Sequence, residues 1–370
     1  MTTYIHQLSD WPRFSWNQHT LASSLVSIRH KQGRLIGHLQ ALGFSIRTEA
    51  VLETLTLDVL KSSEIEGEIL DPEQVRSSLA RKLGIEVTGA LPTDRHVEGI
   101  VAIMVDATQH FDAPLTAQRL FKWHAGLFPT GRSGMHDILA GAWRDDAKGP
   151  MQVVSGPLGR ERVHYEAPDA KRLDSEMMAF MDWINRAETT DPVLRAAIAH
   201  LWFVTIHPFD DGNGRIARAI ADWLLAQSEN SPQRFYSMSA QIRLERNAYY
   251  DMLKRTQLGT LDITPWLEWF LQCLGRAIDA TETTLASVLR KARFWDKRRT
   301  AQLNDRQHLM LNMLLDGFKG KLTSSKWAKL TKCSQDTAHR DIQDLIDQGV
   351  LTKDSAGGRS TSYSLLEAGN

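Results

Sequence analysis

The stretch His207-Pro-Phe-Asp-Asp-Gly-Asn-Gly-Arg-Ile-Ala-Arg218 joins two helical patterns and gathers unusual chemistry into one short segment. The apolar helical pattern before it ends at His207-Pro208, because proline cannot continue a helix, and a new pattern begins after Gly214. Gly212 and Gly214 allow successive backbone N–H groups to point inward, and the following helix adds its positive N-terminal end. The segment therefore predicts a loop that binds a phosphate group.

The side chains of the same segment favour chemistry on a phosphate ester. Asp211 is a hard oxygen ligand of the kind that magnesium prefers, and Arg215 and Arg218 lie on one helical face, where they can contact further phosphate oxygens. His207 is the candidate general base, and we expect the nearby helix N-terminus to keep its imidazole neutral. A Gly-Asn-Gly turn alone usually just connects two helices. No packing requirement explains a base, a carboxylate and two arginines together.

The rest of the chain is expected to be mainly helical. The clearest strand-like stretch is Gln152–Tyr165, and its residues 155–159 predict a hairpin turn. Helical patterns recur at 18–42, 47–63, 72–82, 94–111, 116–128, 169–186, 191–205, 213–228, 244–257 and 262–290.

The chain is long for a single domain, since compact domains usually contain roughly 100–200 residues. Residues 291–303 are rich in lysine and arginine and precede a change in character, which indicates a boundary near residue 300. We expect an N-terminal helical region at 1–93, a central domain at 94–299 and a small separate domain at 300–370.

Composition excludes several classes of protein. The 44 basic and 44 acidic residues balance, so no overall field attracts nucleic acid or an anionic membrane. The first residues lack the features of a signal peptide, and no apolar stretch approaches the ~20 residues needed to span a bilayer. Two isolated cysteines suit a reducing compartment. These observations predict a cytoplasmic protein without a membrane partner.

The 207–218 segment resembles the signature of the Fic family, His-x-Phe-x-Asp/Glu-Gly-Asn-Gly-Arg-x-x-Arg, at every specified position. The resemblance implies an all-α Fic core with a short β-hairpin flap and transfer of AMP from ATP, with Mg²⁺, to a hydroxyl group of a target protein. Related death-on-curing proteins transfer a phosphoryl group and carry lysine at the position of Gly214, so glycine here favours nucleotidyl transfer. The implied roles are catalytic base for His207, metal ligand for Asp211, and ATP-phosphate binding for Gly212, Asn213, Gly214, Arg215 and Arg218.

The resemblance also implies roles for residues outside the signature. In Fic proteins a flap, here residues 152–165, holds the target segment by adding it as a strand. Gly141-Ala-Trp-Arg144, before the flap, fits the family pattern. Tyr250 and Gln257 fall where relatives line the nucleoside pocket, although Gln257 replaces a common asparagine. An ordinary core role on an amphipathic helix is an equal alternative for both residues.

An inhibitory motif is predicted near the end of the 47–63 helix. Gly67 can end that helix, and the acidic Glu66 before it needs a cationic partner, since acids are unfavourable at a helix C-terminus. The pattern Ser62-x-x-x-Glu66-Gly67 resembles the N-terminal class of Fic inhibitory motif. That resemblance implies that Glu66 pairs with Arg218 and blocks the γ-phosphate position, which gives low basal activity.

The last residues resemble a winged helix. The expected order is a helix, a short helix at 324–330, a turn at 331–334, a helix at 335–348 and a hairpin at 352–365. Residues 321–370 carry seven basic and six acidic side chains, and DNA binding relies on neutralising phosphates. DNA contact is therefore less favoured than a protein partner or a homodimer.

Two alternative functions remain open at the level of sequence. A transcriptional regulator could use the nucleotide site as a sensor, but a sensor needs no general base such as His207. The reverse reaction, removal of AMP by water activated through Glu66, is not excluded by any residue. The leading prediction is an autoinhibited protein AMP-transferase.

Overall fold

The structure of this protein is a computed structural model. It describes residues 3–40, 44–86, 91–147, 149–156, 160, 162–186, 189–298, 303–315, 317–318, 320–354 and 361–366. The predicted turn at 155–159 and the tip of the predicted hairpin at 352–365 lie partly outside these residues.

The chain divides into two compact units, Met1–Glu282 and Thr283–Asn370. The division lies about twenty residues before the boundary predicted near 300. Helix α11, Thr264–Asp296, extends past this division into the first part of the basic stretch, and its Phe294 and Trp295 pack against the core of the C-terminal unit. Nearly all residues of the predicted regions 1–93 and 94–299 lie in the first unit.

Helices build most of the first unit. The helix predicted at 244–257 is α10, which begins at Arg246, whereas α9, which ends at Leu244, was not predicted. The remaining predicted helices are found with end shifts of a few residues. Their bounds are α1 Gln18–Gln40, α2 Phe44–Ile65, α3 Pro72–Leu83, α4 Arg95–Gln109, α5 Ala117–Leu127, α6 Leu173–Asn185, α7 Pro192–Ile206, α8 Asn213–Glu229, α9 Met238–Leu244 and α10 Arg246–Gln257. Short 3₁₀ helices occupy Ile5–Gln7 and Ala170–Arg172.

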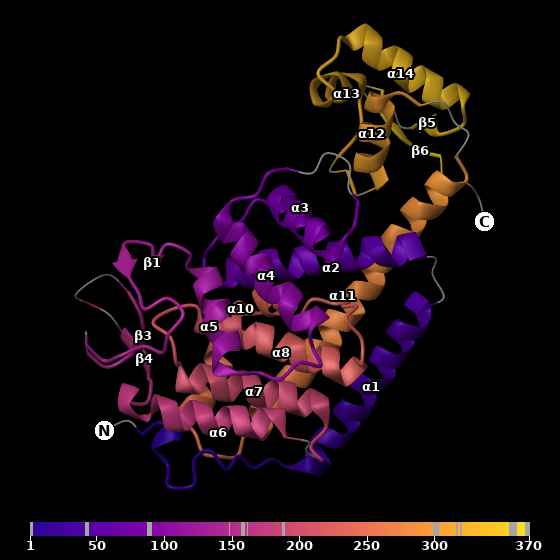
Figure 1. Cartoon of the computed structure of the whole chain (residues 1–370). Helices are drawn as coiled ribbons and strands as arrows, with labels where there is room; N and C mark the ends of the chain where they lie inside the picture. The colour runs from indigo at the N-terminus through magenta and orange to yellow at the C-terminus, as the bar shows by residue number, and fades with distance from the viewer. Residues whose placement is uncertain are drawn as a thin grey trace. The chain divides into compact units, whose positions relative to one another are not determined.

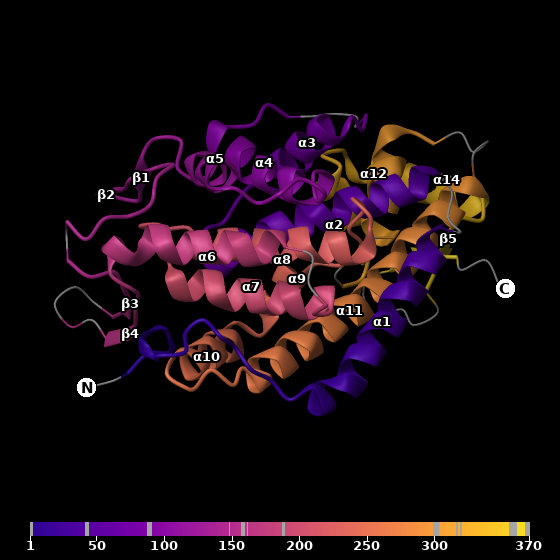
Figure 2. The same ribbon diagram turned by 60° about the horizontal axis from the view of Figure 1, so that its bottom comes forward.

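Helix α7 is the centre of this unit. Its residues from Val193 to Ile206 are almost all buried, as its continuous apolar sequence predicts, and it packs along α8. Helix α6 lies on another side of α7, so the three run side by side (Figure 2). The loop between α7 and α8 is therefore held at both ends by buried helices.

The helix with the predicted inhibitory motif, α2, is fixed to the rest of the unit. It packs on α9 and α3, and α3 packs on α4 (Figure 1). The buried carboxylate of Asp58 on α2 accepts hydrogen bonds from the backbone N–H of Ser239, 3.1 Å, and from the hydroxyl of Ser237. These bonds tie α2 to the N-terminus of α9.

Two antiparallel hairpins lie at one end of the helical unit (Figure 1 and Figure 2). The predicted flap consists of β3, Gln152–Ser155, and β4, Arg162–Glu166, with a register shift between Val153 and Val154. The second hairpin, β1 Arg132–Ser133 and β2 His136–Asp137, was not predicted, since each strand has only two residues and no alternating pattern.

The C-terminal unit has the predicted order of elements. Helices α12, Asp305–Leu315, α13, Ser324–Leu330, and α14, Gln335–Asp347, precede the strands β5, Leu351–Lys353, and β6, Tyr363–Leu365. The two strands pair antiparallel. Trp327, Ile342 and Leu345 are among the buried side chains of a separate core.

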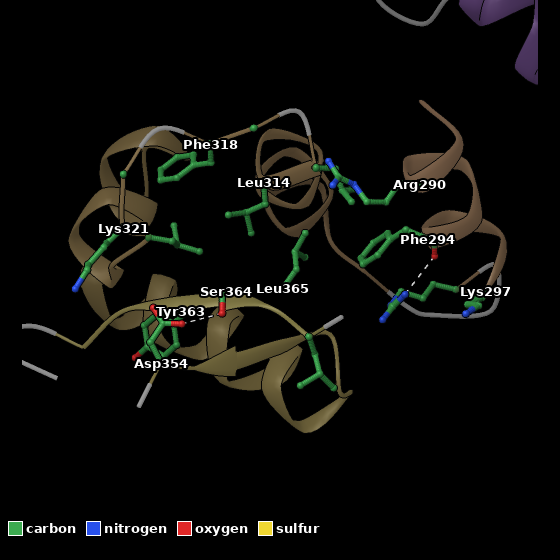
Figure 3. Close-up of a pocket in the computed structure, with 16 residues that line it drawn as sticks. Arg290, Phe294, Lys297, Leu314, Phe318, Lys321, Asp354, Tyr363, Ser364 and Leu365 are labelled. Atoms are coloured by element: carbon green, nitrogen blue, oxygen red, sulfur yellow. Dashed lines mark hydrogen bonds between the residues drawn. The ribbon is translucent and has the colours of Figure 1, made fainter. Parts of the chain in front are cut away.

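A cavity of about 830 Å³ opens within the C-terminal unit. Leu314 on α12 and Leu365 on β6 point toward its centre, and Phe294 at the end of α11 lines one side (Figure 3). The guanidinium of Arg298 lies 4.0 Å from the centre of the Phe294 ring. In the part of the chain that the structure describes, no helix in either unit is long and apolar enough to cross a membrane.

Candidate functional site

The 207–214 loop starts where α7 ends. His207 is the C-cap of α7 with φ 52°, and its N–H donates to the carbonyl of Phe203, 2.9 Å. Gly212, with φ 78°, directly precedes α8. A left-handed conformation is uncommon for a residue other than glycine, and it is one feature that marks functional sites. In this conformation His207 ends α7 and starts the loop.

The side chain of Asn213 closes the loop. Its Oδ1 accepts from the N–H of Phe209, 3.0 Å, and its Nδ2 donates to the carbonyl of Phe209, 2.8 Å. The buried amide thus shapes the backbone. The ATP-binding role expected for Asn213 stays a prediction, and these two bonds involve only its side-chain amide.

Phe209 anchors the loop in the core. It is fully buried and stacks on His124, with ring centroids 4.1 Å apart. The Nδ1 of His124 accepts from the N–H of Gly141, 3.0 Å, so Nε2 carries the hydrogen and donates to the carbonyl of Asp211, 3.2 Å. Burial lowers the pKa of His124 to about 4, so the ring is neutral at pH 7. The neutral ring holds the loop through its bond to the carbonyl of Asp211.

Arg144 braces the start of the loop from the other side. Its Nε donates to the carbonyl of His207, 2.8 Å, and its backbone N–H donates to the carbonyl of Pro208, 2.9 Å. The guanidinium also pairs with Asp146, 2.8 Å, and is buried. The sequence singled out Arg144 only by family resemblance, and the geometry explains its presence.

His207 has the protonation state that a general base needs. Its Nδ1 lies 3.2 Å from the carbonyl of Val204, which can only accept, so Nδ1 carries the hydrogen and Nε2 keeps its lone pair. Burial lowers the pKa of His207 to about 4 and Arg144 adds to this, while the Val204 bond and nearby carboxylates oppose it. The helix N-terminus that we expected to keep the ring neutral is therefore not the main cause.

Asp211 presents one carboxylate at the loop. Oδ1 accepts from the N–H of Gly212, 2.5 Å, and Oδ2 accepts from the hydroxyl of Ser133 on β1. The neighbouring Asp210 faces elsewhere, since its Oδ2 accepts from the N–H of Leu139, 2.9 Å. Among the described residues no three acidic, histidine or cysteine side chains form a metal cluster. A single carboxylate fits Mg²⁺ that takes its other ligands from phosphates and water.

The two glycines of the loop have different reasons to be glycine. A Cβ at Gly212 would lie 2.9 Å from side-chain atoms of both Leu127 and Phe128, and the positive φ disfavours other residues. A Cβ at Gly214 would meet the carboxylate of Glu66 and would lie 3.3 Å from Nη1 of Arg218. The space above Gly214 is thus filled by Glu66.

Arg218 meets the residues of the predicted inhibitory motif. Its Nη2 donates to Oε1 of Glu66, 2.7 Å, and to the carbonyl of Ser62, 2.9 Å, while Nε donates to the hydroxyl of Ser62, 2.9 Å. Arg218 is buried and Glu66 is partly exposed. Gly67 adopts φ 88° directly after Glu66, as expected for a glycine that ends α2.

A second ion pair lies beside the first and was not predicted. Nη1 of Arg215 donates to Oε2 of Glu68, 2.9 Å, and the other oxygen of Glu68 contacts Nε2 of His96 on α4. The hydrogen bond to Glu68 raises the pKa of His96. The signal in the sequence was the spacing Glu66-Gly67-Glu68, which matches two arginines three residues apart on α8.

The predicted nucleoside-pocket residues lie in different surroundings. The hydroxyl of Tyr250 donates to Oε2 of Glu66, 3.4 Å, so Tyr250 borders the site. Gln257 is buried, and its amide donates to the hydroxyl of Thr205 on α7, 3.4 Å. The structure thus brings Tyr250 to Glu66 and Gln257 to Thr205, and the nucleoside-pocket role of both residues stays a prediction.

Two family models match the chain. Residues 114–225 match the model described as Fic/DOC family, and residues 4–85 match a domain of unknown function, DUF4172. The first range includes the 207–214 loop and both signature arginines, and the second includes Ser62, Glu66 and Gly67.

Curated relatives carry the name protein adenylyltransferase. The protein adenylyltransferase Fic of Nematostella vectensis is 35% identical over 117 residues, which are 30% of this chain and 25% of the relative. The protein adenylyltransferase fic-1 of Caenorhabditis elegans is 28% identical over 243 residues, 64% of this chain and 44% of the relative. The matched part of this chain spans less than half of the length of either relative.

Solved structures share the fold. A crystal structure of a Fic family protein from Desulfovibrio desulfuricans G20 superposes with a TM-score of 0.52 at 22% identity, covering 94% of this chain and 97% of that chain. Fic-1, residues 134–508, from C. elegans superposes with a TM-score of 0.51 at 22% identity, covering 73% and 74%. The helical architecture with small hairpins is therefore a Fic fold.

Proposed function

Because residues 114–225 of this chain form a Fic domain, we propose that the protein transfers AMP from ATP to a hydroxyl side chain of a target protein and that Glu66 restrains this activity. The observation that carries the proposal is the state of His207. Its imidazole is neutral, with the hydrogen on Nδ1 and the lone pair on Nε2, directly before an anion-binding loop.

The proposed reaction uses the loop and the base together. Nε2 of His207 takes the proton of the target hydroxyl while that oxygen forms a bond to the α-phosphorus of ATP. The bond from the α-phosphorus to its bridging oxygen breaks, and pyrophosphate leaves. The backbone N–H groups at the start of α8 and the guanidinium groups of Arg215 and Arg218 bind the phosphates of the nucleotide. Positioning and charge neutralisation account for most catalysis of this type.

Mg²⁺ fits this scheme as a companion of ATP. Asp211 would hold it, together with phosphate oxygens, and the ion would neutralise phosphate charge. The contacts of Asp211 with Ser133 and with the N–H of Gly212 keep its carboxylate in place at the loop.

The target segment is proposed to dock on the flap. Strands β3 and β4 form a two-stranded sheet in the described residues, and Val154 and Val163 leave 46% and 42% of their surfaces exposed. Such a hairpin can accept a further strand through main-chain hydrogen bonds. Arg144 connects the flap to the loop, because it donates both to the carbonyl of Pro168, which follows β4, and to the carbonyl of His207. A segment docked on the flap would therefore hold its hydroxyl side chain near His207.

Autoinhibition is supported by the contacts of Arg218. Glu66 and Ser62 use its Nε and Nη2, so the γ-phosphate and Glu66 compete for one guanidinium. A ligand that binds only the displaced state must overcome this competition, and the apparent affinity for a productively placed ATP falls accordingly.

Replacement of Glu66 tests activity and restraint together. We expect Glu66→Gly to incorporate label from α-labelled ATP into itself and into lysate proteins at least about tenfold faster than wild type, the effect of about 1.4 kcal/mol of relieved competition. Label in the γ-phosphate should not be incorporated. Mass spectrometry should find modified peptides heavier by AMP.

Glu64→Gly is the matched control. Glu64 is in the same last turn of α2 but pairs with Lys61, 2.6 Å, and faces Arg243, 3.5 Å, rather than a signature arginine. Its rate should rise far less than that of Glu66→Gly, because the two variants share any loss of helix stability that glycine causes. Equal labelling by Glu66→Gly and wild type would contradict autoinhibition, and incorporation of γ-label would contradict nucleotidyl transfer.

For the C-terminal unit we propose a winged helix that binds protein rather than DNA. The order α12, α13, α14, β5 and β6 supports the fold. The candidate recognition helix α14 exposes Asp336, Asp344 and Asp347, which would repel phosphates. We expect the full chain to leave a mixed-sequence duplex unshifted in a gel at 150 mM salt. A salt-dependent shift at submicromolar protein would overturn this proposal.

A further inference from the structure

Glu68 makes the closest ionic contact of the first signature arginine. Oε2 of Glu68 accepts from Nη1 of Arg215 at 2.9 Å, and the Arg215 side chain is only 9% exposed. The guanidinium lies against the ring of Phe128, 5.2 Å from its centre. Arg215 is thus held between an aromatic face and a carboxylate, both of which favour a cation.

Both signature arginines are only partly satisfied. Nε of Arg215 and Nη1 of Arg218 are buried and have no hydrogen-bond partner among the described residues. A buried donor without an acceptor is unfavourable, and a phosphate oxygen at either position would satisfy it. Each guanidinium group therefore donates to a glutamate and also has one buried N–H group for which the described residues supply no acceptor.

The two glutamates belong to one turn. Glu66 and Glu68 flank Gly67, whose φ of 88° reverses the chain at the end of α2. The turn is closed by bonds from the N–H of Glu68 to the carbonyl of Ser63, 3.0 Å, and from the N–H of Gly67 to the carbonyl of Glu64, 3.1 Å. A change in this turn would move both carboxylates.

We propose that Glu68 is a second inhibitory carboxylate: it occupies Arg215 in the absence of nucleotide while Glu66 occupies Arg218. This inference rests on the proposed function, in which both arginines bind phosphates of ATP. The phosphates and Glu68 are all anionic and compete for the same guanidinium. His96, which binds the other oxygen of Glu68, orients that carboxylate from α4.

A permanent supporting role for Glu68 makes the opposite prediction. If Glu68 only positioned Arg215 for the nucleotide, its removal would leave the guanidinium misplaced and would weaken ATP binding. A competing carboxylate, by contrast, must be displaced, and its removal strengthens ATP binding. The sign of the change in affinity separates the two roles.

The experiment measures binding of a non-hydrolysable ATP analogue with Mg²⁺ by titration calorimetry on the full chain. We expect Glu68→Gln, made in the Glu66→Gly background, to tighten binding by roughly three- to fivefold, as suits a partly exposed ion pair. Glu68→Ser repeats the measurement should the glutamine variant be unstable in a thermal melt. Unchanged or weaker binding in the stable variants would overturn the inference.

Glu49→Gln in the same background is the matched control. Glu49 is also on α2 and pairs with Arg76, 2.8 Å, at an exposed position. It should leave the dissociation constant unchanged. If the Glu68 variants bind the analogue more tightly while no variant transfers AMP, the second carboxylate stands and the transferase proposal fails. If Glu66→Gly transfers AMP and Glu68→Gln does not tighten binding of the analogue, the transferase proposal stands and the second inhibitory carboxylate fails.

Discussion

His207 owes its neutral state to its surroundings. Burial, above all, lowers its pKa to about 4, and the Val204 carbonyl selects the tautomer with a free Nε2. A base with such a low pKa is a weak proton acceptor in the resting state but is fully deprotonated at neutral pH. The contribution of His207 to catalysis therefore comes from the position of its Nε2 and from the free lone pair on that atom at neutral pH.

Loss of this imidazole should abolish transfer without abolishing nucleotide binding. In the Glu66→Gly background we expect His207→Ala to lower the rate of AMP incorporation by about 10²–10⁴-fold, the usual contribution of a general base. Calorimetry should still detect the ATP analogue, since the loop and arginines remain. Full activity of this variant would remove His207 from the catalytic role.

The pH profile offers an independent check on His207. Because the pKa of His207 is about 4 in the folded protein, the base is available throughout the neutral range. Glu66 is among the groups that raise this pKa, so its removal shifts the pKa further down. We expect the labelling rate of Glu66→Gly to be flat between pH 6 and pH 8.5. A titration near pH 6.5 that disappears in His207→Ala would contradict the assignment.

The last turn of α2 is the element that connects the inhibitory residues to the site. Arg246 caps it, with its Nε donating to the carbonyl of Ile65, 2.8 Å, and Arg218 binds the carbonyl of Ser62. Cations at a helix C-terminus interact favourably with its dipole, which offsets the unfavourable position of Glu66. Both arginines therefore contribute to the stability of the turn.

Gly67→Ala should weaken this turn and raise basal activity. A left-handed conformation costs an alanine roughly 1–2 kcal/mol, and no atom lies within 4 Å of the added Cβ, so backbone strain is the main effect. We expect a severalfold increase in labelling from α-labelled ATP compared with wild type.

Gly84→Ala provides the comparison for this variant. Gly84 ends α3 with φ 68° and also has open space at its Cβ, so the loss of stability should be similar. Its labelling rate should equal that of wild type. If both variants increased labelling equally, general destabilisation rather than the α2 turn would be responsible.

At the scale of the whole molecule, four buried histidines among the described residues make the folded chain sensitive to acid. His6, His124 and His207 have pKa values lowered to about 4 and His200 to about 3, with burial as the largest cause each time. The unfolded chain binds protons at these residues below pH 6.5 and the folded chain does not. Stability is therefore lost as pH falls from 6.5 toward 4. His96 acts in the opposite direction, because Glu68 raises its pKa.

Urea unfolding followed by tryptophan fluorescence should show this acid sensitivity. We expect the free energy of unfolding to fall by up to about 5 kcal/mol per pH unit below pH 6 if all four histidines contribute. His200→Gln should reduce the slope by about one proton, while His19→Gln, at an exposed position of α1, should not. A slope unchanged by His200→Gln would exclude His200 from the effect.

Local sequence was sufficient for most of the helices and for part of the site. Apolar periodicity located α7 and α8, and the proline at 208 and the glycines at 212 and 214 located the loop between them. These features depend on backbone geometry over a few residues, so they can be predicted without knowledge of the tertiary structure. The strands β1 and β2 were missed because two residues carry no periodic signal.

The sequence by itself determined an anion-binding loop with a histidine, a carboxylate and two arginines, because those residues are contiguous and their chemistry is local. Only the tertiary structure decided what each side chain does. Asn213 shapes the loop, Gln257 lies in the core, burial sets the pKa of His207, and Glu68 meets Arg215. Burial and contacts between residues nearly 150 positions apart depend on how α2, α4 and α8 pack, and no local pattern encodes that packing.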